Sequence, residues 1–248
     1  MRKVLLAILL CIPGLLGSSM AWSSSADIEW HMQPFDGDLE NLPSLQNGMR
    51  IYVNYCLGCH GLKFQRYEAT VDYLGIPHDI AMENLVFSDQ KIGELMTTAM
   101  DSESAKAWFG VAPPDLTLVT RLRGPEWVYN YLKTFYVDDD RPLGTNNKVF
   151  PNVAMPNVLA QLQGIQREAC KPGDADHVCQ KLAVDDGTGE YDTEEFDAAV
   201  YDLTNFLYYV GEPSRLERHR IGIFVMLFLV ILGCFTYLLN REYWKDIH

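Results

Sequence analysis

The stretch Cys56-Leu57-Gly58-Cys59-His60 constrains this chain more than any other, because it reads C-x-x-C-H. That pattern is typical of c-type haem attachment. Two thiols three residues apart lie on one side of a helical turn, where each can form a thioether with a haem vinyl group. The histidine that follows then serves as the proximal ligand of the iron. The alternatives are a disulfide, half of a zinc site or a thioredoxin-like motif. The last two would need a second ligand pair or a βαβ surround, and the sequence shows neither.

The remaining cysteines fall into two kinds. Cys11 and Cys234 lie in the apolar runs near the two ends of the chain, and Cys170 and Cys179 lie between them. An even pair in a domain that we expect to be exported predicts a disulfide, with two free thiols as the alternative.

The first 21 residues have the features of a secretory signal peptide. Arg2 and Lys3 precede an apolar run, and small residues stand at the positions before a cleavage site after Ala21, with Ala26 as a second possible site. An uncleaved anchor is the alternative. The segment lacks the Arg- and Ser-rich amphipathic character of a mitochondrial presequence, which indicates a bacterial protein. We therefore expect residues 22–212 to form one periplasmic domain.

The run Ile221–Leu239 contains 19 residues without a charge. As a helix it would extend about 28 Å, close to the hydrocarbon core of about 30 Å. It predicts a membrane anchor over 213–240, with its apolar core at 221–239 and a tail at 241–248. Basic residues flank it on both sides, so the signal peptide, rather than the charges, predicts a periplasmic domain and a cytoplasmic C-terminus.

The chain is strongly acidic, and this bears on its partners. The formal net charge is −13, and loss of Arg2 and Lys3 would lower it to −15. Nucleic acid is excluded as a partner, whereas a basic protein is favoured. No Lys or Arg lies between Lys181 and Arg215, although nine acidic residues do. This run is either a docking face or an ordinary solvated face.

The sequence predicts a mainly α fold. Helices are expected from an N-cap at Ser44 into the haem motif, over 89–108, from Pro125, and from Asp192 to Gly211. Pro113 and Pro114 predict an extended, rigid segment between the second and third of these helices. Residues 137–192 are expected to be rich in loops.

The sixth ligand of the iron remains open on residue chemistry alone. Met155 precedes Pro156 in a loop, and the proline restricts it to extended geometry, so a stiff loop can present its thioether. A thioether favours ferrous iron and raises the potential. The other candidates are Met82, Met96, Met100, His78, His177 and His219.

Three stretches resemble the cytochrome c1 family, the haem-bearing subunit of the cytochrome bc1 complex (ubiquinol–cytochrome c reductase), and together with the anchor they cover nearly the whole mature chain. They are residues 45–67 around the motif, Ala112-Pro113-Pro114-Asp115-Leu116 followed by Arg121-Leu122-Arg123, and Ala154-Met155-Pro156.

The resemblance implies a class I cytochrome c-like haem domain with inserted loops, plus one C-terminal transmembrane helix. It implies one covalently attached haem c, held by Cys56 and Cys59, with His60 and Met155 as axial ligands of the iron. Pro113 and Pro114 would pack on the proximal side, where a carbonyl can accept the His60 ring N–H. The pocket would also include Arg123, near a propionate, and Trp127, which stands where the family often has tyrosine.

The resemblance also implies a function. The chain would accept one electron from the Rieske iron–sulfur protein and pass it to a basic cytochrome c, within a dimeric complex that includes cytochrome b. It would perform no bond chemistry of its own. The rival interpretations are an anchored monohaem cytochrome c serving another respiratory complex, a haem sensor or peroxidase with an open sixth site, and a structural anchor whose haem is incidental.

Overall fold

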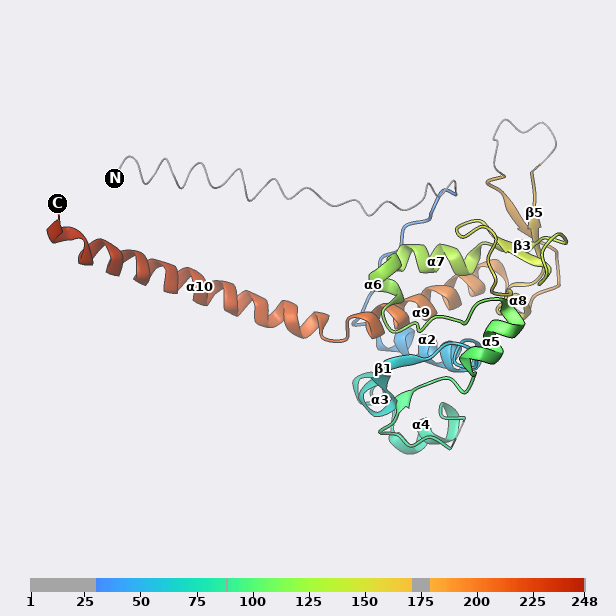
Figure 1. Cartoon of the computed structure of the whole chain (residues 1–248), viewed down its shortest axis with the longest axis horizontal. Helices are drawn as coiled ribbons and strands as arrows, with labels where there is room; N and C mark the ends of the chain where they lie inside the picture. The colour runs from blue at the N-terminus through green and yellow to red at the C-terminus, as the bar shows by residue number, and fades with distance from the viewer. Residues whose placement is uncertain (1–29, 88, 171–178, 248) are drawn as a thin grey trace.

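The computed structural model of the chain describes residues 30–87, 89–170 and 179–247 (Figure 1). The predicted signal peptide and its cleavage sites, and the candidate ligand His177, lie outside the described residues. The helices are α2 (Leu42–Tyr55), α3 (Tyr67–Leu74), α4 (His78–Asn84), α5 (Ser102–Phe109), α6 (Val119–Arg123), α7 (Pro125–Lys133), α8 (Ala160–Gln163), α9 (Thr193–Gly211) and α10 (Arg215–Tyr243), followed by a 3₁₀ turn at Lys245–Ile247.

The strands in the described ranges form three separate antiparallel pairs. They are β1 (Leu62–Arg66) with β2 (Leu95–Met96), β3 (Phe135–Val137) with β4 (Thr145–Asn147), and β5 (Gln166–Glu168) with β6 (Leu182–Val184). The fold is therefore mainly α, as the sequence predicts. The pairs β3–β4 and β5–β6 lie in or at the edge of the region 137–192 that was expected to be rich in loops, whereas α3 and α4 separate β1 from β2.

The centre of the domain is the packing of α2 against α9, two helices that lie more than a hundred residues apart in the sequence (Figure 1). Leu45, Met49 and Tyr52 of α2 and Leu203 and Phe206 of α9 are all buried to 0% exposure. A Cβ at Gly48 of α2 would lie 2.1 Å from the Asp202 carbonyl oxygen of α9. The close approach of these helices therefore requires a glycine at position 48.

Each helix of this pair has a side-chain cap at its N-terminus. Asp192 accepts a hydrogen bond from Glu195 N at 2.9 Å, and the Glu195 carboxylate accepts one from Asp192 N at 3.1 Å. The prediction that α9 begins at Asp192–Thr193 is confirmed. The prediction of Ser44 as the N-cap of α2 is wrong, because Asn41 caps the helix and Pro43 lies within its first turn. The Ser44 hydroxyl instead donates to the Asp202 carboxylate.

The predicted helix over 89–108 is also wrong. Its middle forms β2, which pairs with β1, and helical structure begins only at Ser102, where the Asp101 side chain caps α5. Met96 is buried to 0% exposure in the core, and the Thr98 hydroxyl donates to the Gly58 carbonyl at 2.9 Å. Pairing and burial along this segment outweigh a weak helical periodicity.

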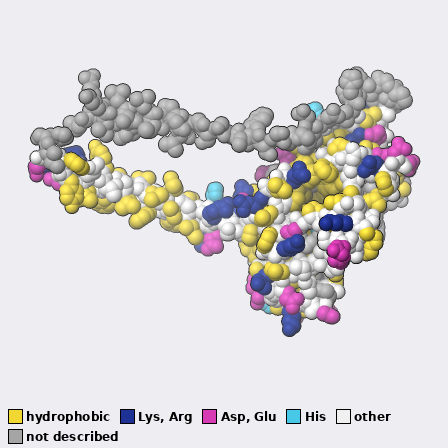
Figure 2. All heavy atoms as spheres, viewed as in Figure 1, with side chains coloured by type: hydrophobic (Ala, Val, Ile, Leu, Met, Phe, Trp, Pro, Cys, Tyr) yellow, Lys and Arg dark blue, Asp and Glu magenta, His cyan; other side chains and the backbone are white. Residues whose placement is uncertain are grey.

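Helix α10 extends away from the domain (Figure 1) and contains the predicted apolar run 221–239. It is the helix in the described chain that is long and apolar enough to cross a membrane, and none of its residues is buried against the domain. Figure 2 shows a hydrophobic rod with Lys and Arg side chains gathered where it leaves the domain. The described part of the chain therefore supports the prediction of a single C-terminal membrane anchor.

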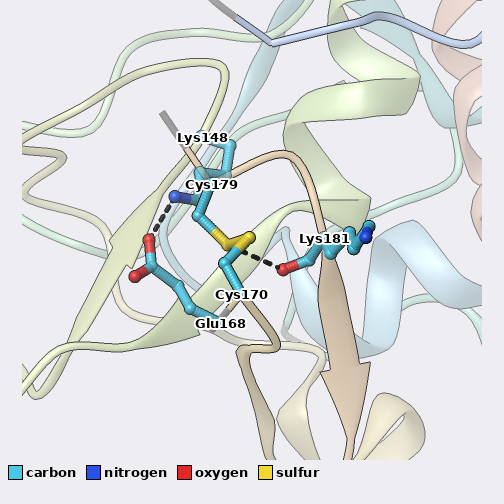
Figure 3. Close-up of a disulfide and its surroundings, with 5 residues drawn as sticks. All are labelled: Lys148, Glu168, Cys170, Cys179 and Lys181. Atoms are coloured by element: carbon cyan, nitrogen blue, oxygen red, sulfur yellow. Dashed lines mark hydrogen bonds and ion pairs between the residues drawn. A yellow bond between two sulfur atoms is a disulfide. The ribbon is translucent and has the colours of Figure 1, made fainter. Parts of the chain in front are cut away.

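The prediction of a disulfide between Cys170 and Cys179 is confirmed, with a Cα–Cα distance of 5.6 Å. Cys170 follows β5 and Cys179 precedes β6, so the disulfide joins the ends of these two strands. It lies beside the Lys148–Glu168 ion pair (Figure 3). The other described cysteines, Cys56, Cys59 and Cys234, are free thiols.

Candidate haem site

The C-x-x-C-H motif forms a tight turn at the C-terminal end of α2. Cys56 N donates to the Tyr52 carbonyl at 2.8 Å, and Cys59 N and His60 N both donate to the Cys56 carbonyl, at 3.0 and 2.8 Å. The Tyr52 hydroxyl donates to the His60 carbonyl at 2.6 Å, and burial raises the pKa of this phenol, which keeps it protonated. The turn is thus anchored to the helix from both of its ends.

The two thiols of the motif fit a pair of thioether bonds. Cys56 is buried and Cys59 partly buried, and the two are not joined to each other in a disulfide. Burial, reinforced by the neighbouring Cys59 thiol, raises the pKa of Cys56 to about 12. A buried, neutral thiol is a poor metal ligand, since metals bind the thiolate. Both thiols are therefore uncommitted in the described structure, as attachment through two thioethers requires.

His60 is oriented by a carbonyl of the double-proline segment. Its Nδ1 lies 2.7 Å from the Pro114 carbonyl oxygen, which can only accept, so Nδ1 carries the proton. Burial lowers the pKa of His60, partly opposed by the bond to Pro114 and the charge of Asp115, so the ring is neutral. The lone pair is then on Nε2, the atom that a haem iron would take.

The segment that carries this carbonyl is itself fixed to the motif. The Asp115 carboxylate accepts hydrogen bonds from Lys63 N at 2.8 Å and from Thr117 N at 3.0 Å. Leu116 N donates to the Gly61 carbonyl at 3.0 Å. Pro113 and Pro114 are therefore held beside His60 by the residues that follow them.

Met155 lies in the loop before α8 and contacts Tyr131 of helix α7. The Tyr131 hydroxyl donates to the Met155 sulfur at 3.2 Å, and burial raises the pKa of Tyr131, which keeps this donor protonated. Tyr131 stacks on Trp127 with 4.9 Å between ring centroids. The Arg123 guanidinium lies 5.2 Å from the Trp127 ring and 5.9 Å from the Phe150 ring.

The predicted site residues therefore form two groups. Cys56, Cys59, His60, Pro113 and Pro114 lie together at the end of α2. Arg123 of α6 and Met155 of the loop before α8 both adjoin α7, through Trp127 and Tyr131 respectively. No hydrogen bond or ion pair within the described ranges joins the two groups, which are connected through residues 115–122 of the chain.

The other candidate ligands that the structure describes have surroundings of a different kind. Met96 is fully buried in the core, with its sulfur 3.9 Å from the Thr70 hydroxyl. His78 lies 2.7 Å from Asp72 on the exposed surface. Met82 is exposed on α4, Met100 is partly buried, and His219 is exposed on α10. Met155 combines partial burial, a rigid loop and a hydroxyl donor at its sulfur.

Sequence reasoning did not identify three residues that shape this site. Tyr131 contacts the Met155 sulfur, Tyr52 holds the carbonyl of His60, and Asp115 fixes the proline segment. A signal was present for Tyr131, which lies four residues after Trp127 on the apolar face of a helix. A buried hydroxyl on such a face needs a partner.

Known proteins resemble this chain over nearly its whole length. The model of the Cytochrome C1 family matches residues 30–247. A cytochrome c1 of Allochromatium vinosum is 46% identical over 100% of both chains. A Nitrosomonas europaea protein named ammonia monooxygenase gamma subunit is 43% identical over 94% of this chain and 95% of its own. A solved chain from a hyperthermophilic respiratory complex III covers 100% of both chains at 13% identity with a TM-score of 0.45, which is too distant to bear on function.

Proposed function

The chain belongs to the cytochrome c1 family and is an electron-transfer subunit of a bc1 complex, and we propose that it takes single electrons from the Rieske iron–sulfur protein and passes them to a cytochrome c. Like other members, it carries one covalently attached haem c. The observation that supports the site most directly is the turn at 56–60, where two uncrosslinked thiols adjoin a neutral histidine whose Nδ1 donates to a carbonyl.

Each residue of the proposed site has a separate task. Cys56 and Cys59 would hold the haem through thioethers, and His60 would present Nε2 to the iron while Pro114 keeps its ring in place. Met155 presents its sulfur from the loop beside α7, with the Tyr131 hydroxyl bonded to it. When bound, the haem supplies a reversible ferric–ferrous couple, so no substrate bond is made or broken. Two protein ligands in both oxidation states keep structural rearrangement small.

Arg123 and Trp127 complete the proposed pocket. The Arg123 guanidinium lies over an aromatic ring, and no ion pair occupies it within the described residues. A guanidinium placed in this way can pair with a propionate carboxylate. The two prolines, 113 and 114, form the rigid wall on the histidine side.

The proposed assembly follows from the family and from the anchor. The partners are cytochrome b and the Rieske protein, in a dimeric complex. The haem domain would lie in the periplasm and the C-terminus in the cytoplasm, an orientation supported by the predicted signal peptide at 1–21. We also propose the sequence boundaries given above: mature domain 22–212, anchor 213–240 and tail 241–248.

A basic acceptor would meet an acidic face around the start of α9. Of the nine acidic residues in the lysine- and arginine-free run, Asp185, Asp197 and Glu212 form ion pairs, and Asp202 bonds to Ser44 and Asn47. The other five are exposed and form no ion pair within the described ranges: Asp186, Glu190, Asp192, Glu194 and Glu195. Acidic side chains are visible at the end of the domain away from α10 (Figure 2).

The test is to purify the tagged full chain gently from its native membranes in detergent. Its reduced-minus-oxidised optical spectrum and its co-purifying chains are then recorded together. We expect b-type signals beside the c-type band, and cytochrome b and Rieske chains in the preparation. A c-type band alone, in a preparation that retains its native partners, would contradict the proposal. It would favour an anchored carrier for another membrane complex, the possibility to which the name of the Nitrosomonas relative draws attention.

A further inference from the structure

The loop that carries Met155 contains an unusual backbone conformation. Asn152, three residues before Met155, has a φ of 62° and is the one non-glycine residue with positive φ in the described chain. Left-handed backbone is unfavourable for a residue with a Cβ, although asparagine tolerates it better than most. Such a conformation persists only where the surroundings fix it.

The surroundings that fix Asn152 come from the β3–β4 hairpin. Arg141 donates from Nη1 to the Asn152 side-chain oxygen and from Nη2 to its carbonyl oxygen, both at 3.1 Å. Asn152 N donates to the Asn146 side-chain oxygen at 2.8 Å, and Asn146 Nδ2 donates to Asp138 at 2.8 Å. One guanidinium and one amide therefore bind the main chain of Asn152 on both sides.

The Arg141 side chain makes its hydrogen bonds to Asn152. Within the described ranges its guanidinium forms no ion pair, and its Nε is buried without a hydrogen-bond partner. Leaving a buried donor unpaired is unfavourable. The position of the Arg141 guanidinium is therefore better explained by its two hydrogen bonds to Asn152 than by any stabilisation of the fold through Nε.

We propose that Arg141 is a positioning residue for the iron ligand Met155. Its two bonds to Asn152 hold the strained start of the loop, and the stiff residues up to Pro156 transmit this position to the sulfur. This inference rests on the proposed axial role of Met155. Without the two bonds, the loop would leave its left-handed conformation and the sulfur would detach from the iron for a larger fraction of the time.

The first test is Arg141→Lys in the full-length haem protein, which keeps the charge but cannot bind two oxygens as a fork. We expect the fraction of ferrous protein that binds CO to rise about tenfold, the scale of losing charge-assisted hydrogen bonds. The charge-transfer band of methionine bound to ferric iron should weaken in parallel. Arg167→Lys, which alters the exposed pair with Asp185 at 3.0 Å, is the matched control and should change neither signal.

A rescue separates positioning from general destabilisation. Glycine adopts a positive φ without cost, so adding Asn152→Gly to Arg141→Lys should restore most of the band and of the resistance to CO. A second comparison leaves Arg141 intact: Asn152→Ala should increase CO binding, and Asn152→Gly should not. This pair shows whether the left-handed conformation at residue 152 controls the position of Met155, even when the arginine variant fails to accumulate.

Different results would overturn different claims. A native protein that binds CO freely and lacks the methionine band would refute the axial role of Met155. A CO-inert native protein, with Arg141→Lys and Asn152→Ala both unchanged, would refute the positioning role alone. Loss of the band without any rescue by Asn152→Gly would show that Arg141 acts on the whole domain and not on the loop.

Discussion

At the scale of single residues, binding of the iron depends on which nitrogen of His60 is free. The Pro114 carbonyl can only accept a hydrogen bond, so it fixes the proton on Nδ1 at 2.7 Å and leaves Nε2 for the iron. This contact was expected in part, because the resemblance to the cytochrome c1 family implied that a carbonyl of the Pro113–Pro114 segment accepts the His60 ring N–H. The contacts that hold the segment, from Asp115 to Lys63 N and Thr117 N, depend on tertiary structure and were not predictable from the sequence.

Replacement of the proposed sixth ligand gives the first prediction. Met155→Leu keeps the apolar volume but removes the thioether, so the ferrous haem should bind CO rapidly and the reduction potential should fall. Met82→Leu, at an exposed position on α4, is the control and should behave as the native protein. The measurement is CO binding to dithionite-reduced protein with a parallel redox titration. Unchanged CO inertness and potential in Met155→Leu would show that another group binds the iron.

The hydroxyl beside Met155 gives the second prediction. Tyr131→Phe removes a hydrogen bond to the sulfur at 3.2 Å and leaves the ring stacked on Trp127. Donation to the sulfur withdraws electron density from the iron and favours the ferrous state. We expect the potential to fall by tens of millivolts, since a net hydrogen bond contributes about 0.5–1.5 kcal/mol and 59 mV corresponds to tenfold. Tyr129→Phe on the same helix is the control. A redox titration in which both variants match the native protein would exclude this role of the hydroxyl.

At the scale of elements, the helix pair α2 and α9 sets the position of the motif. The C-x-x-C-H turn continues directly from α2, so any displacement of α2 moves both thiols and His60. The apolar stripes of both helices were readable from the sequence, because their periodicity is strong. The residue that Gly48 packs against could not be predicted, because the approach of α2 to the Asp202 carbonyl joins segments that are remote in the chain.

This contact gives the third prediction. In Gly48→Ala, the new Cβ would lie 2.1 Å from the Asp202 carbonyl oxygen and 2.6 Å from Phe206 Cβ, so the helices must separate. We expect a loss of about 3 kcal/mol or more in the free energy of unfolding. Gly222→Ala, where a Cβ would meet nothing within 4 Å, is the control. Denaturant unfolding followed by the haem absorbance measures both, and equal stability of the two variants would contradict the packing described here.

The segment 89–108 shows where prediction from sequence fails at this scale. Apolar residues at helical spacing suggested one helix, but Leu95 and Met96 pair with β1 and Met96 fills the core. Short strands carry almost no periodicity of their own, so only the partner strand reveals them. By contrast, α7 and α9 were predictable because a proline in the first turn and an Asp–Glu capping box mark their starts.

At the scale of the whole molecule, the membrane anchor and the exposed acidic surface belong to different ends of the haem domain. Helix α10 leaves the domain at one end, and α9 begins at the other (Figure 1). The exposed acidic residues 186, 190, 192, 194 and 195 lie around the start of α9. The anchor and the acidic composition were readable from the sequence. The division of acidic residues into ion-paired and unpaired groups was not, because the ion pairs of Asp197 and Glu212 involve residues that are distant in the chain.

The acidic face gives the fourth prediction. Neutralising Asp186, Glu190 and Glu194 as Asn, Gln and Gln should lower the rate constant for reduction of a basic cytochrome c several-fold at low salt and flatten its dependence on ionic strength. The control neutralises Asp79, Glu83 and Asp89, which are exposed in another part of the domain and change the net charge equally. Stopped-flow kinetics over a range of salt compare the two. Equal effects would mean that only net charge matters and that the α9 face is not a docking site.

The function proposed for this chain is to carry electrons from quinol oxidation through a covalently held haem. The most direct measurement is the reduction of the c haem after quinol is added anaerobically to the natively purified, oxidised full-length protein with its partners. We expect the c haem to be reduced within the turnover time, and loss of the Rieske protein to abolish this reduction. A c haem that stays oxidised with quinol, although dithionite reduces it, would contradict the proposed function.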